Sequence, residues 1–129
     1  MKRKFRLRSN REIGELRRTG RTWANSMLVL IARPNALEHS RFGFSVSRRI
    51  GSAVRRNRVR RLLREAARLR FGQLSLGWDL LVIARAPIAG ADFWVVDEAL
   101  ADALGRAGLL RTPEEPEAAP DATSALDAT

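Results

Sequence analysis

The spacing of hydrophobic and polar residues predicts a short helix and two or three strands in the first part of the chain. Ser9 and Glu12 have the spacing of an N-terminal capping box, and Gly20 is placed to end the helix that they begin. Residues 22–33 are almost continuously apolar, which predicts a strand buried on both faces. Residues 41–47 alternate between Phe or Val and small residues, which predicts a strand with one buried face.

The rest of the chain is predicted to hold a long helix at residues 54–70, an apolar strand at 78–86 and a last helix capped by Asp92. Trp78 and Trp94 are expected in the core. Because a helix joins the last strand to the strand before it, these two strands are expected to be parallel. The predicted fold class is α+β, with a small mixed four-stranded sheet packed with helices.

The composition predicts one domain followed by an acidic tail. The 129 residues fit a single domain over residues 1–110, and residues 111–129 are rich in Pro, Ala and acidic side chains, which predicts disorder. The chain has no Cys and one His, which excludes a disulfide scaffold and a cysteine nucleophile. It has no apolar run of membrane-spanning length and no secretory signal, so we expect a cytoplasmic protein without a membrane partner.

Positive charge is concentrated before residue 72. The chain has 24 Lys and Arg against 14 Asp and Glu, and 21 of the 24 basic residues lie in residues 1–71. This asymmetry indicates a polyanionic partner. Only Lys2 and Lys4 are lysines; a GC-rich genome explains part of the excess of arginine, but it does not explain the clustering.

The helix predicted at residues 54–70 has an apolar face and an arginine-rich face. The expected buried side chains are Val59, Leu62, Leu63, Ala66 and Leu69. The side chains expected on the opposite face are Asn57, Arg60, Arg61, Arg64 and Arg68, with Arg58 beside them. Because Glu65 is the single acidic residue of the segment, the arginines repel one another unless an anion neutralises them.

The arginine-rich face of this helix has three possible interpretations: a solvated surface, a membrane-surface helix or a nucleic-acid interface. A solvated charged face usually mixes both signs of charge, and a membrane-surface helix needs its apolar face free, whereas the flanking strands require that face for the core. Nucleic acid therefore remains the favoured partner. An unbroken arginine face suits the phosphates of structured RNA better than base readout in DNA, although a helix in a DNA major groove stays possible.

Residues 44–65 read FSVSRRIGSAVRRNRVRRLLRE, and in this stretch the chain closely resembles the protein component of bacterial ribonuclease P. That family carries a strand ending Ser-Val-Ser followed by two basic residues, then Gly-x-Ala-Val and an Arg-Asn-Arg motif, here Arg56-Asn57-Arg58. The likeness extends over about 100 residues and includes Arg6-Leu7-Arg8. The acidic tail lies outside it.

The resemblance implies a subunit of an RNA–protein endonuclease that removes the 5′ leader from precursor tRNA. In that family the RNA subunit is the catalyst and coordinates Mg²⁺, so the implied partners are the ribonuclease P RNA and the precursor's leader, with no small-molecule substrate. No catalytic residue and no metal site are expected in the protein. The family fold is a ribosomal-protein-like sandwich, with a left-handed β-α-β crossover that runs against a general rule.

The resemblance also implies two sets of site residues. The residues expected to bind RNA are Arg48, Arg49, Arg55, Arg56, Asn57, Arg58, Arg60, Arg61, Arg64 and Arg68. The residues expected to form the leader cleft are Ile13, Arg17, Ile31, Phe42 and Phe44. The first three match positions that are commonly aromatic in the family, so leader binding here is expected to depend more on charge.

Two other functions fit the same pattern. A ribosomal or RNA-assembly protein could use this small scaffold, but it would not distinguish precursor from mature tRNA. An autonomous protein nuclease would cut without an RNA subunit.

Overall fold

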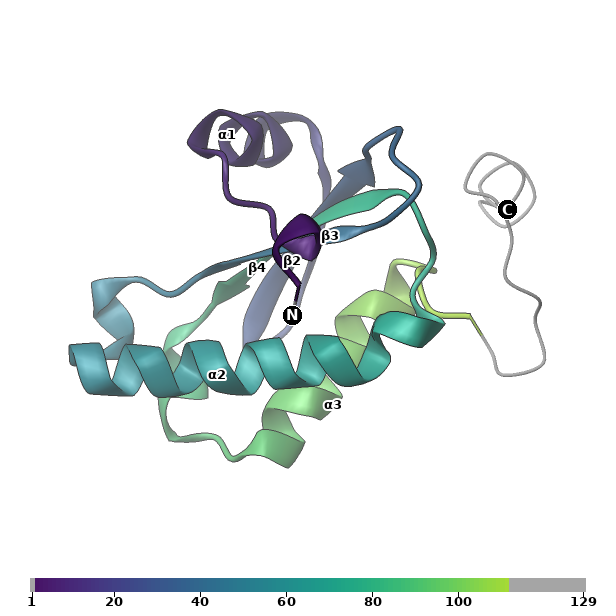
Figure 1. Cartoon of the computed structure of the whole chain (residues 1–129). Helices are drawn as coiled ribbons and strands as arrows, with labels where there is room; N and C mark the ends of the chain where they lie inside the picture. The colour runs from purple at the N-terminus through teal and green to yellow at the C-terminus, as the bar shows by residue number, and fades with distance from the viewer. Residues whose placement is uncertain (1, 112–129) are drawn as a thin grey trace.

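A four-stranded sheet separates one helix on one face from two helices on the other in the computed structural model, which describes residues 2–111 (Figure 1). The helices are α1 (Asn10–Thr19), α2 (Ala53–Arg70) and α3 (Phe93–Arg106). The strands are β1 (Arg21–Ala24), β2 (Leu28–Pro34), β3 (Arg41–Ser45) and β4 (Trp78–Ala84). Short 3₁₀ turns are η1 (Arg3–Phe5), η2 (Arg48–Ile50), η3 (Phe71–Gln73) and η4 (Ala86–Gly90).

The sheet has the order β1-β2-β4-β3. Strand β2 is antiparallel to β1 and β4, whereas β3 and β4 are parallel and are connected through α2. The predicted α+β class and the predicted parallel pair are therefore confirmed. The left hand of the crossover stays an expectation from the resemblance.

Residues 22–33 contribute to two strands, β1 and β2, because the chain reverses at Asn25. Of the two or three strands predicted before the long helix, the structure therefore has three. The Asn25 side-chain oxygen accepts hydrogen bonds from the backbone N–H groups of Met27 (3.0 Å) and Leu28 (3.1 Å). An Asn side chain that replaces a backbone acceptor in this way stabilises a turn. Only β2, on the far side of the turn, is buried on both faces; β1 is an edge strand and is largely exposed.

Two cores lie on opposite faces of the sheet. The larger core packs the sheet against α2 and α3, and α3 contributes Val96, Leu100 and Leu104 to it. The smaller core packs α1 and the N-terminal segment against the other face through Leu7, Leu16, Ile31 and Leu81. The central strands β2 and β4 contribute to both cores, which explains their continuous apolar sequence.

Two residues expected in the core are exposed instead. Trp94 is 72% exposed because it precedes the buried Val96 by two residues, or about 200° around an α-helix. Leu69 is 54% exposed because the last turns of α2 face the core with Ala66 and Ala67, and Leu69 lies outside that buried side. Trp78 is half-buried against the larger core.

The described residues end at the position where the tail is predicted to begin. The last described residue, Arg111, donates its backbone N–H to the carbonyl of Gln73 at 2.7 Å, so it is attached to the folded domain. The predicted tail otherwise lies outside the described residues. Within residues 2–111, no helix is both long enough and apolar enough to cross a bilayer.

Candidate nucleic-acid interface

The start of α2 is fixed by a glycine and a serine. Gly51 has φ of 143°, a conformation that favours glycine, and a Cβ there would lie 2.8 Å from the Arg55 side chain. The Ser52 hydroxyl then accepts a hydrogen bond from the Arg55 backbone N–H at 3.3 Å and caps the helix. This junction leaves Arg48 and Arg49 exposed in η2, just before the helix begins.

Packing of α2 on the sheet directs its arginines outward. Val59, Leu63, Ala66 and Ala67 are buried against the larger core, and the opposite side of the helix is solvent-exposed. The exposed residues on that side are Asn57, Arg61, Arg64 and Arg68. We call this set the outer face of α2. It reproduces the predicted arginine face except at Arg60.

Three of the predicted RNA-binding arginines are half-buried at the margins of α2. Arg58 donates a hydrogen bond to the Ala91 carbonyl at 3.1 Å, and Arg60 donates to the Asn57 side-chain oxygen at 3.1 Å. Arg56 is half-buried as well. The remaining predicted residues, including Arg55, are exposed.

Acidic side chains neutralise little of this surface. Glu65 binds Arg68 at 2.6 Å, and this hydrogen bond lowers the pKa of Glu65 and raises the pKa of Arg68. Arg70 binds Asp97 at 2.7 Å on the side of α2 toward α3. Within residues 2–111, the other arginines from Arg48 to Arg64 form no ion pair with a carboxylate. The outer face therefore carries uncompensated positive charge.

The structure places two further arginines beside α2 that are not among the predicted RNA-binding residues. Arg6 and Arg8 line a groove together with Arg60 and Arg64. The sequence contains one signal for this arrangement, because the buried Leu7 lies between two arginines and an extended chain alternates its side chains. The sequence does not show that the segment Arg6-Leu7-Arg8 pairs with β3, beside α2.

The five residues expected in the leader cleft do not lie on one surface. Ile13 and Ile31 belong to the α1 side of the sheet, and Arg17 reaches across from α1 to the Ser45 hydroxyl at 3.5 Å. Phe42 and Phe44 point to the opposite face, where their rings stack with centroids 5.7 Å apart.

The grouping of these five residues in one cleft is therefore wrong, because strand alternation places Phe42 and Phe44 on the α2 side. Ile31 is only 7% exposed under α1, so it offers little surface itself. Beside it, Val29 and Ile83 are half-buried on the same face. Sequence alternation along β2 could have assigned Val29 to this surface.

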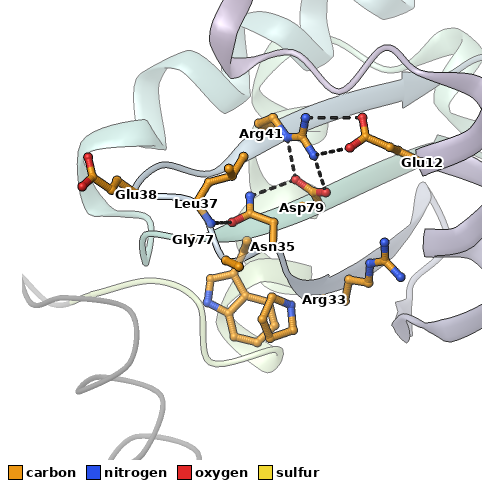
Figure 2. Close-up of a pocket in the computed structure, with 11 residues that line it drawn as sticks. Glu12, Arg33, Asn35, Leu37, Glu38, Arg41, Gly77 and Asp79 are labelled. Carbon is orange, nitrogen blue, oxygen red and sulfur yellow. Dashed lines mark hydrogen bonds and ion pairs between the residues drawn. The ribbon is translucent and has the colours of Figure 1, made fainter.

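An ion-pair network centred on the buried Asp79 fixes α1 to the sheet (Figure 2). Arg41 binds Asp79 through two hydrogen bonds of 2.9 and 2.8 Å, and it also binds Glu12 of α1 at 3.1 Å. These carboxylates, Asp79 above all, raise the pKa of Arg41. The predicted capping box is therefore only half formed: Ser9 accepts from the Glu12 backbone, and the Glu12 carboxylate reaches Arg41.

The network lines a cavity of about 620 Å³, in which Asn35 donates a third hydrogen bond to Asp79 at 2.9 Å. The Asp79 carboxylate is thereby engaged by protein donors, and we assign it a structural role. Within residues 2–111, no group of three or more His, Cys, Asp or Glu side chains is arranged to hold a metal ion.

The fold and the arginine-rich outer face of α2 define a small α+β nucleic-acid-binding protein. Comparison with known families narrows this class, because the family model for Ribonuclease P matches residues 1–108. The chain belongs to the ribonuclease P protein family. It is thus an RNA-binding subunit of a tRNA-processing ribonuclease.

Individual relatives agree with this assignment. The ribonuclease P protein component of Roseiflexus sp. strain RS-1 is 45% identical over 115 residues, covering 88% of this chain and 94% of that protein. The component of Herpetosiphon aurantiacus is 39% identical over 116 residues, covering 90% and 94%.

Solved structures of the family share the fold. The RNase P protein of Thermotoga maritima, solved in complex with 1-(4-fluorophenyl)-2-thiourea, superposes with a TM-score of 0.74 at 36% identity, covering 78% of this chain and 98% of that one. A Staphylococcus aureus RNase P protein mutant with defective mRNA degradation activity gives a TM-score of 0.79 at 28% identity, covering 83% and 91%.

Proposed function

We propose that this chain binds the catalytic RNA of ribonuclease P through the outer face of α2 and helps to hold the 5′ leader of precursor tRNA. The observation that carries the first part is the uncompensated positive charge of that face: Arg61 and Arg64 are exposed and pair with no carboxylate in residues 2–111. Clustered guanidinium groups suit phosphate oxygens, which they contact through paired hydrogen bonds.

The leader is assigned to the α1 side of the sheet. Ile13, Arg17 and the half-buried Val29 and Ile83 offer apolar surface beside one guanidinium group. Arg17 supplies the positive charge for a leader phosphate, and the aliphatic side chains supply contact area for bases. Because these positions hold no aromatic ring, the leader contact depends more on salt than on stacking.

The RNA subunit supplies the catalysis in this proposal, and the Mg²⁺ ions are assigned to the RNA. The protein acts on binding: the outer face of α2 holds the catalytic RNA, and the α1 side increases the affinity for substrates that retain a leader. Mature tRNA lacks the leader phosphates and bases, so the protein contributes less to its binding.

Reconstitution tests the proposal. The purified protein with Mg²⁺ should leave precursor tRNA intact, and adding the RNA subunit should give cleavage at the leader junction. Arg61→Ala should weaken assembly with the RNA subunit, whereas Arg17→Ala should weaken binding of precursor tRNA but leave binding of mature tRNA unchanged. Equal affinity of the RNA subunit for leader-bearing substrate, with and without the protein, would contradict the leader assignment.

The rival functions give different results in the same experiment. A ribosomal or assembly protein would not respond to the leader. Because the S. aureus mutant is described by its defective mRNA degradation activity, the RNA-free protein should also be assayed on mRNA. Cleavage of either RNA by a homogeneous protein preparation would favour an autonomous nuclease.

A further inference from the structure

The N-terminal segment Arg6-Leu7-Arg8 lies along the outer edge of β3. The backbone N–H of Leu7 donates to the Phe42 carbonyl at 2.7 Å, and Arg6 forms a parallel bridge with Phe42. Leu7 is 3% exposed within the core on the α1 side. Because side chains alternate along extended chain, Arg6 and Arg8 point to the α2 side of the sheet.

A glycine of β3 permits this close approach. A Cβ at Gly43 would lie 3.1 Å from the Leu7 carbonyl oxygen and 3.4 Å from the Leu7 Cβ. The first distance is shorter than an ordinary van der Waals contact, so a side chain at position 43 would push the N-terminal segment away from the strand. The position of the two arginines therefore depends on the sheet edge, not on α2 alone.

Arg6 and Arg8 meet Arg60 and Arg64 of α2 around a groove of about 260 Å³, and Phe44 forms part of its wall. Arg60 is held in place by hydrogen bonds to the Asn57 side chain at 3.1 Å and to the Val46 carbonyl at 3.4 Å. None of the four arginines pairs with a carboxylate in the described part of the chain. Four like charges around one groove repel one another unless an anion enters it.

We propose that this groove binds an unpaired nucleotide of RNA, with its flanking phosphates on Arg6, Arg8 and Arg64 and its base against Phe44. Phe44 is half-buried and supported by the parallel ring of Phe42, so it can offer a preformed surface for stacking. An unpaired base fits this chemistry because bases in an RNA duplex are already stacked on their neighbours.

The inference rests on the proposed RNA-binding function and extends it from one helix to a second element, the N-terminal segment. The unpaired nucleotide can come from the RNA subunit or from the precursor's leader. Both sources present the same phosphates and base, and the two arms of the experiment distinguish them.

The test compares two double variants that each remove two positive charges from residues 3–8. Arg6→Ala/Arg8→Ala removes groove residues, whereas Arg3→Ala/Lys4→Ala removes exposed residues that do not line the groove. Affinity is measured against salt concentration, first for the RNA subunit alone and then for precursor tRNA with the assembled holoenzyme. The groove variant should flatten the slope of log K against log salt by about 1.4–1.8 in one of these arms.

The control variant Arg3→Ala/Lys4→Ala should change the slope of log K against log salt by no more than a few tenths in either arm. Phe44→Leu keeps an apolar side chain in the core and should lower affinity in the same arm by about fivefold or more through lost stacking. Circular dichroism and thermal melting establish that each variant is folded. Gly43→Ala gives an independent test, because it should reduce affinity in that arm while every arginine is retained.

Two results would overturn the proposal. One is an equal effect of the groove and control variants, which would show that only net charge matters. The other is an unchanged slope in both arms for the groove variant while Arg61→Ala still weakens RNA binding. The second result would rule out nucleotide binding in the groove but would leave the proposed role of the outer face of α2 intact. If neither the groove variant nor Arg61→Ala changed RNA binding, the proposed function itself would be ruled out.

Discussion

Replacing Arg61 or Arg64 with Ala tests whether the outer face of α2 contacts RNA phosphates. Both residues are exposed, and neither pairs with a carboxylate in residues 2–111. Each substitution therefore removes one charge without leaving a buried partner unsatisfied. Because Ala is the best helix former, the free energy of unfolding should stay within about 0.5 kcal/mol of the parent value.

The expected loss of RNA affinity follows from counterion release. Each lost phosphate contact should flatten the slope of log K against log salt by about 0.7–0.9. Between 1 M and 0.15 M salt, one such contact raises log K for RNA binding by about 0.6–0.7. This corresponds to about 0.8–1.0 kcal/mol of binding free energy. Each single variant should thus bind the RNA subunit about four- to fivefold more weakly at 0.15 M salt.

Filter binding or fluorescence titration of the RNA subunit at several salt concentrations measures both quantities. Arg18→Ala is the matched control, because Arg18 is also an exposed helical arginine but belongs to α1, on the opposite face of the sheet. The control should keep the parent slope. Unchanged affinity and slope in folded Arg61→Ala and Arg64→Ala proteins would mean that this face is merely solvated, and an equal effect of Arg18→Ala would mean that only net charge acts.

Four other outcomes are expected. Glu65→Gln frees Arg68 from its ion pair, so that Arg68 can contact an RNA phosphate. The slope of log K against log salt should therefore steepen by about 0.7–0.9 at most, the value for one phosphate contact. In the parent protein, NMR titration should give Glu65 a pKa below the unfolded value, so the Arg68 interaction persists above about pH 4.3 and is lost as pH falls through that lowered pKa. Asp79→Ala should cost about 1.5–3 kcal/mol in urea unfolding, since Arg41 loses its main partner but keeps its ion pair with Glu12; a loss below 1 kcal/mol would contradict the structural role. Deleting residues 112–129 should leave the melting temperature unchanged and should not weaken RNA binding at low salt, because the segment carries five acidic and no basic side chains; a large drop in melting temperature would contradict this.

The sequence alone determined the features that depend on near neighbours in the chain. Asp92 caps α3 as predicted, and Ser9 does the same for α1. The α2 periodicity correctly separated Val59 and Leu63 from the exposed arginines, because one helical period fixes the relative direction of residues three and four apart. The parallel pairing of β3 and β4 followed from the helix between them.

Only the tertiary structure decided which element covers each of these faces. Alternation showed that Phe42 and Phe44 share one side of β3, but the sheet had to form before that side could be assigned to α2 and not to α1. The turn at Asn25 likewise divides an apolar run that periodicity could not divide. Arg6 and Arg64 are 58 positions apart and meet at one groove, because the N-terminal segment pairs with the edge of β3 beside α2. A period in the sequence gives the direction of a side chain relative to its own backbone; contacts between distant segments depend on the order of strands and the packing of layers, which no local pattern contains.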